Sequence, residues 1–99
     1  MTCKVIGLIQ LKDSRAFDEY RSQVGKTVEL YGGRVCTRGQ FQKSFWNELN
    51  CDLFNAYVEL EFKDSAAAES WAQSPEYQCL VGIRSKAMNL TLFSVAINH

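Results

Sequence analysis

The sequence is poor in the residues on which metal-dependent and histidine-dependent enzymes rely. Its 99 residues include one histidine, and lysine plus arginine match aspartate plus glutamate at 11 each. This balance leaves no excess of cations for nonspecific binding to nucleic acid or to an anionic membrane. The four cysteines form no C-x-x-C pair, and the histidine is the final residue, His99, which we expect to be frayed and exposed. We therefore expect neither a metal site nor a cofactor.

Long apolar runs are also missing. The run from Val5 to Ile9 spans five residues before Gln10 interrupts it, which is too short for a signal peptide core or a membrane-spanning helix. We therefore expect a cytoplasmic protein with free thiols. A content of 46% hydrophobic and 12% aromatic residues is typical of a folded globule, and a chain this short holds one core. We predict a single domain over residues 1–99.

Apolar runs and alternation of apolar with polar residues predict four strands, near residues 3–11, 34–38, 52–62 and 88–97. The period of two is clearest over residues 52–62, where Val58 and Leu60 share one face. Asn55, Tyr57 and Glu59 then share the opposite face. The polar stretch between the second and third strands is predicted to be mostly loop.

Helical spacing predicts two main helices, near 14–31 and 65–73, and a short extra helix from Pro75. Asp13, Asp64 and Ser74 precede these helices as N-caps. The element order is therefore β-α-β-β-α-β, the α+β ferredoxin-like arrangement with a four-stranded antiparallel sheet.

Two helices cover only one face of such a sheet. The other face keeps large apolar groups, including Leu53 and Tyr57, and their exposure to water costs about 25 cal/mol per Å². We therefore expect a homodimer through the open sheet face, in which two sheets pack across a two-fold axis into a barrel.

Four local patterns resemble a bacterial family catalogued as domain of unknown function 1330, within the dimeric α/β-barrel superfamily. They are the helix opening from Asp13 to Tyr20, Tyr31-Gly32-Gly33-Arg34, Arg38-Gly39, and Ser74-Pro75-Glu76-Tyr77-Gln78 with Arg84. The resemblance covers nearly the whole chain. It implies a ferredoxin-like fold and a dimer, and it implies no particular reaction.

The face that carries Asn55, Tyr57 and Glu59 is the candidate site. If Arg38 points to the same face, a carboxylate, a phenol, an amide and a guanidinium converge in a cavity between the two sheets. Glu59 would then be a general base and Tyr57 a proton donor or oxyanion partner, with Arg38 and Asn55 binding the ligand. The alternative is a structural ion pair between Arg38 and Glu59.

Other side chains also have two interpretations. Tyr77 and Arg84 lie two helical turns apart, so they either hold an anion at the cavity mouth or pack as structural groups. Trp71, among alanines at helical spacing, is predicted to be core. Phe45 and Trp46 form either a lid or a dimer contact.

Two functions from different classes remain. The first is a noncatalytic or accessory protein that binds a small polar or aromatic molecule in the intersheet cavity. The alternative is a cofactor-independent acid–base enzyme of the isomerase, cyclase or oxygenase type, acting on a small oxygenated compound, by analogy with other dimeric α/β-barrel families. A lone, desolvated Glu59 beside an open cavity favours the enzyme, whereas a bidentate ion pair between Glu59 and Arg38 in a filled interior favours a purely structural role for the pair.

Overall fold

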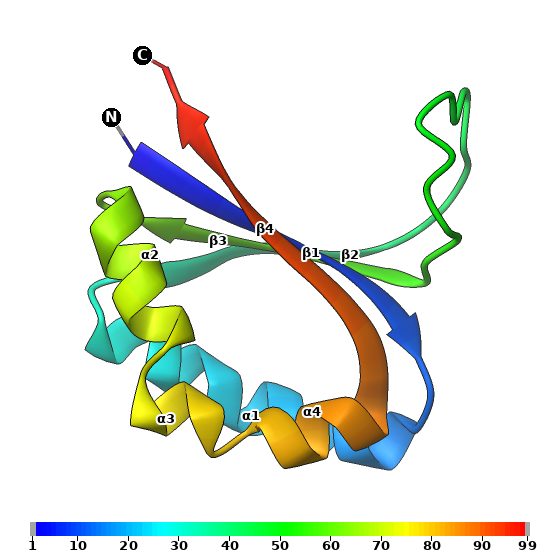
Figure 1. Cartoon of the computed structure of the whole chain (residues 1–99). Coiled ribbons are helices and arrows are strands. Elements are labelled where there is room, and N and C mark those ends of the chain that lie inside the picture. The colour runs from blue at the N-terminus through cyan, green and yellow to red at the C-terminus, as the bar shows by residue number, and fades with distance from the viewer. Residues whose placement is uncertain (1, 99) are drawn as a thin grey trace.

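The computed structural model describes residues 2–98 and has the predicted element order. Its elements are β1 (Thr2–Leu11), α1 (Ser14–Leu30), β2 (Arg34–Gln40), β3 (Ala56–Phe62), α2 (Ser65–Ala72), α3 (Pro75–Gln78), α4 (Val81–Ala87) and β4 (Met88–Ile97). The predicted short extra helix is in fact two short helices, α3 and α4. Figure 1 shows all four helices gathered on one side of a twisted sheet.

The sheet has the strand order β2-β3-β1-β4, and every neighbouring pair is antiparallel. Strand β1 is central, and its Val5 pairs with Leu60 on one side and Ser94 on the other. Alternate β1 residues are buried beneath the helices, as the period of two predicts for a sheet covered on one face.

Strand β3 begins four residues later than predicted. The first residue of β3, Ala56, pairs with Gln40 of β2. Before Ala56, the backbone of Asn55 still hydrogen-bonds to the sheet: its N–H donates to the Ile9 carbonyl of β1 at 2.7 Å. Residues 52–54 lie outside the sheet although their alternation continues. The reason is that β2 ends at Gln40 and leaves the preceding residues without a partner strand.

The predicted helix caps are confirmed. The side chains of Asp13, Asp64 and Ser74 each accept a hydrogen bond from a backbone N–H in the first turn of α1, α2 and α3 respectively. Helix α1 ends where Gly32 takes a φ of 78°, a left-handed conformation that glycine adopts without a Cβ clash.

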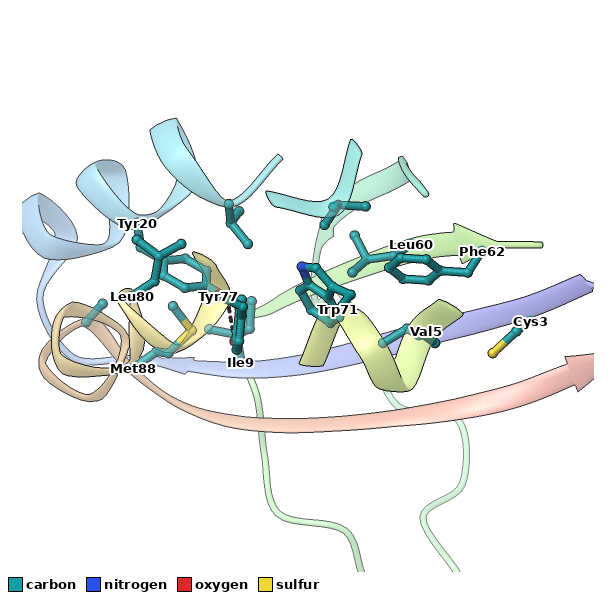
Figure 2. Close-up of a cluster of buried hydrophobic side chains, with 14 of the residues drawn as sticks. Cys3, Val5, Ile9, Tyr20, Leu60, Phe62, Trp71, Tyr77, Leu80 and Met88 are labelled. Atoms are coloured by element: carbon teal, nitrogen blue, oxygen red, sulfur yellow. Dashed lines mark hydrogen bonds between the residues drawn. The ribbon is translucent and has the colours of Figure 1, made fainter. Parts of the chain in front are cut away.

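The core lies between the helices and the sheet. Val28, Phe62, Trp71 and Tyr77 are fully buried there, so the prediction that Trp71 belongs to the core is confirmed. Figure 2 shows Trp71 between the pair Tyr20 and Tyr77 on one side and Leu60 and Phe62 on the other. The Trp71 indole Nε1–H donates to Thr27 at 3.0 Å, which satisfies its polar atom within the core.

The sheet face away from the helices, here called the open face, keeps apolar side chains in contact with solvent. Phe93 and Val95 of β4 are 43% and 39% exposed. The connection between β2 and β3, residues 41–55, is here called the arm, and Figure 1 shows it projecting from the sheet on the side away from the helices. Its exposed apolar side chains are Phe45, Trp46, Leu49 and Leu53. Within residues 2–98, no helix is long and apolar enough to cross a membrane.

We predict that Gly33→Ala lowers the free energy of unfolding by about 1–3 kcal/mol, the cost of overpacking. A Cβ at Gly33 would lie 2.5 Å from a ring carbon of Phe62 and 2.9 Å from the Glu61 carbonyl oxygen. Gly25→Ala is the control, because nothing lies within 4 Å of its Cβ position in the middle of α1. It should raise stability by about 0.5–1 kcal/mol. Urea denaturation measures both changes, and equal effects would contradict the packing at Gly33.

Candidate functional site

A hollow in the described part of the chain lies between α1 and the helix-covered face of the sheet. It has a volume of about 530 Å³, within the range of about 300–1,000 Å³ usual for small-molecule pockets. Its interior is lined by apolar side chains, Ile9, Val24, Leu60, Trp71, Met88, Leu90 and Leu92 among them. Exposed lining residues, including Arg21, Arg38 and Gln40, mark its mouth.

Two arginines from different elements line this mouth. Arg21 belongs to α1, where its guanidinium lies 5.2 Å from the centre of the Phe17 ring and 3.8 Å from the Asp18 carboxylate. Arg38 belongs to β2 and pairs in register with Val58, whose side chain packs against the core under the helices. The mouth is therefore positively charged.

A chain of polar groups stands behind the inner wall. Tyr20 lines the cavity, and its hydroxyl is 2.9 Å from the hydroxyl of Tyr77, which accepts a hydrogen bond from Arg84 Nη1 at 2.9 Å. Burial raises the pKa of Tyr20 far above its ordinary value, so the phenol stays protonated. Because accepting from a cation polarises the Tyr77 hydroxyl, donation from Tyr77 to Tyr20 is favoured. The Tyr20 hydrogen is then available to a second acceptor.

Tyr77 and Arg84 are in direct contact, and this contact joins two short helices. The Arg84 guanidinium also lies 5.6 Å from the Tyr77 ring centre. Both residues sit behind Tyr20 and do not themselves line the cavity. Their geometry corresponds to the packed interpretation more closely than to an anion site at the mouth.

The side chains of Glu59 and Tyr57 lie on the open face, as predicted; Tyr57 also borders the cavity, whereas Glu59 does not line it. The Tyr57 hydroxyl donates to Glu59 Oε2 at 3.1 Å, and Lys4 Nζ lies 3.2 Å from Glu59 Oε1. Burial and the bond to the Glu59 carboxylate raise the pKa of Tyr57. Glu59 is therefore a paired carboxylate.

Lys4 is the centre of this open-face cluster, and the sequence reasoning missed it. Its ammonium also lies 3.2 Å from Glu61 and 3.6 Å from the Cys36 sulfur. Hydrogen bonds to Glu61 and Glu59 raise the pKa of Lys4, and bonds from Lys4 and Arg34 lower the pKa of Glu61. The signal was the alternation of β1, which puts Lys4 opposite Glu61 in register.

The expected convergence of Arg38 with Glu59 does not occur. An irregularity between Val35 and Thr37 shifts the register of β2, so that Thr37 stands opposite Glu59 and Arg38 stands opposite Val58. A β-bulge of this kind inserts one residue and reverses the face of those that follow. The predicted site is therefore divided between the two faces of the sheet.

Asn55 has a local role in the structure. Its side-chain Oδ1 accepts a hydrogen bond from the Leu11 N–H at 2.8 Å, and Asn55 lines the cavity near the start of β3. Within residues 2–98, no group of three or more histidine, cysteine or acidic side chains is arranged to hold a metal ion. The four cysteines are free. His99 lies outside the described residues.

Comparison with solved structures defines the fold as ferredoxin-like. A protein of unknown function from Rhodopseudomonas palustris, RPA0582, matches with a TM-score of 0.80 and 19% identity, over 99% of this chain and 83% of that one. A dimeric ferredoxin-like protein of unknown function from Thermobifida fusca matches with a TM-score of 0.68 and 11% identity, over 98% and 92%. SnoaB, a cofactor-independent oxygenase from Streptomyces nogalater, matches with a TM-score of 0.69 and 9% identity, over 99% and 94%.

The family is identified by sequence. The model of the family described as "Domain of unknown function (DUF1330)" matches residues 4–97, which is nearly the whole chain. The chain therefore belongs to this family, and the resemblance inferred from its local patterns is confirmed. No curated protein matches the chain. At identities this low, the similarity to the solved structures shows the fold alone.

We predict that Tyr77→Phe lowers the free energy of unfolding by about 1–3 kcal/mol, because it leaves both Tyr20 and Arg84 without their shared partner. Tyr31→Phe is the control, since the Tyr31 hydroxyl donates to Glu76 in an exposed position. That change should cost less than about 0.5 kcal/mol. Thermal and urea unfolding measure both variants. Equal losses would show that the buried chain of hydroxyls contributes no more than a surface bond.

Proposed function

We propose that this protein is a homodimeric small-molecule-binding protein, and that the molecule occupies the cavity between α1 and the sheet. The observation that carries the proposal is the cavity itself, about 530 Å³ with a largely apolar interior and a positively charged mouth. Such a combination of apolar walls with a few convergent polar groups is the usual form of a ligand site. The ligand then has an apolar or aromatic body. The proposed location differs from the intersheet site expected from the sequence.

The lining chemistry favours binding over acid–base catalysis. Its ionisable residues are the two arginines at the mouth, Tyr20 and Tyr57. Arginine does not lose its proton near neutral pH, burial raises the pKa of Tyr20, and the Tyr57 hydroxyl is bound to Glu59. A proton acceptor poised near neutral pH would have to come from elsewhere.

The alternative function is a cofactor-independent enzyme of the kind that SnoaB represents within the same fold. Its general base in this chain would be Glu59, with Tyr57 as proton donor. Glu59 faces away from the cavity interior and is held by Lys4 and Tyr57, which supports a structural role for the carboxylate. Noncatalytic binding is therefore the first proposal.

The homodimer is supported by the open face and by the arm. Phe93 and Val95 are exposed on the face that the helices leave bare. The arm projects on the same side of the sheet (Figure 1) and includes Trp46, which is 83% exposed. A second copy packed on the open face would cover these side chains. Solved neighbours of this fold include proteins described as dimeric, among them the Thermobifida fusca protein.

We predict a dimeric mass at micromolar concentration by light scattering, and a monomeric mass for Phe93→Lys, because a lysine on the open face would be desolvated in the dimer. The variant should also unfold at a lower temperature, since association and folding are linked by mass action. Leu30→Lys is the control. Leu30 is 67% exposed on α1, away from the open face. Monomeric wild-type protein would refute the dimer.

We predict that N-phenyl-1-naphthylamine, a neutral aromatic probe, binds with a stoichiometry of one per chain and with increased fluorescence. Val24→Trp fills the cavity from α1 and should abolish this binding. Gln23→Trp, one position away on the exposed side of the same helix, should keep it. Circular dichroism and light scattering test whether both variants fold and assemble. One probe per dimer, unaffected by Val24→Trp, would instead support the intersheet site.

A further inference from the structure

We propose that the natural ligands of the cavity are amphipathic carboxylic acids, whose carboxylate is bound by Arg38 at the mouth while the apolar body lies inside. This inference rests on the proposed function and adds the chemical class of the ligand. A purely apolar cavity would not select for a carboxylate head group, so the selection must come from charged residues at the mouth.

The first argument is the sign of the charge around the cavity. The charged side chains of the lining are Arg21 and Arg38, and both are cationic. The interior beyond them is built from aliphatic and aromatic groups. A ligand that satisfies both regions has an anionic end and an apolar end, because an apolar body gains from burial and an anion gains from the two guanidinium groups.

The second argument is how Arg38 reaches the mouth. Regular alternation from Val35 would put Arg38 on the open face, beside the acidic cluster of Glu59 and Glu61. The bulge between Val35 and Thr37 turns it to the helix side, opposite Val58. Bulges recur where a side chain is redirected toward a functional site. Here the bulge moves Arg38 away from the Glu59 and Glu61 carboxylates and places it beside the cavity.

The third argument is the state of the two guanidinium groups. Within residues 2–98, no carboxylate forms an ion pair with Arg38, whereas Arg34 of the same strand is paired with Glu61 at 3.1 Å. Arg21 lies over the Phe17 ring, and its ion-pair partner is the exposed Asp18 carboxylate at 3.8 Å; such exposed pairs contribute little. An unpaired guanidinium presents the planar fork that binds a carboxylate through two parallel hydrogen bonds.

The test compares decanoate with 1-decanol, two probes with the same chain and different head groups, each used below the concentration at which it aggregates. Their dissociation constants are measured by displacement of N-phenyl-1-naphthylamine. In the wild-type protein, decanoate should bind about tenfold more tightly than decanol. Arg38→Gln should remove that preference by weakening decanoate about tenfold and changing decanol less than about threefold. Arg38→Lys should recover part of the preference, because the charge remains but the fork is lost.

Arg34→Gln is the matched control, since it removes the same charge from the same strand on the other face. It should leave both dissociation constants within about twofold of the wild-type values. Equal binding of decanoate and decanol by the wild-type protein would overturn the carboxylate assignment and leave the proposed cavity in place. Equal effects of Arg38→Gln and Arg34→Gln would overturn the role of Arg38. Failure of decanoate to displace N-phenyl-1-naphthylamine would overturn the ligand class, and failure of N-phenyl-1-naphthylamine itself to bind would overturn the proposed function.

Discussion

Strand β1 imposes the constraint on which the rest of the structure depends. It hydrogen-bonds to both β3 and β4, so neither of its edges is free along most of its length. Its alternation fixes which side chains go under the helices and which go to the open face. Val5 and Ile9 enter the core, whereas Lys4 goes to the open face and meets Glu59 and Glu61. One strand thus separates an apolar chamber from an ionic cluster.

The bulge in β2 is the exception to this separation, and the positive charge at the mouth of the cavity depends on it. An edge strand tolerates an extra residue because only one neighbour must accommodate it. Cys36 lies in the bulged segment, and its sulfur stays on the open side, near the Lys4 ammonium. Arg38 then faces the helices. A cation therefore reaches the apolar side of the sheet, while the ionic cluster keeps a lysine of its own.

Much of the fold could be predicted from the sequence because local rules and tertiary packing agree there. The caps at Asp13 and Asp64 and the alternation through Leu60 each specify one conformation. The start of β3 could not be predicted, because alternation continues into residues that have no partner strand. The side of the sheet on which Arg38 lies could not be predicted from the sequence either, because no glycine or proline marks the bulge between Val35 and Thr37. The cavity was missed because its walls come from residues that are distant in the chain and meet only in the fold.

The arm and the cavity share two lining residues, Phe41 and Phe54, although the arm projects away from the helices and the cavity lies beneath them. The Phe41 N–H donates to the Asn55 carbonyl at 2.8 Å, which closes the base of the arm directly beyond β2 and β3. Phe41 and Phe54 pack edge to face, with ring centres 5.0 Å apart, and both rings belong to the lining of the cavity and to the hollow beside the arm. Contacts that order the arm therefore also order one end of the cavity.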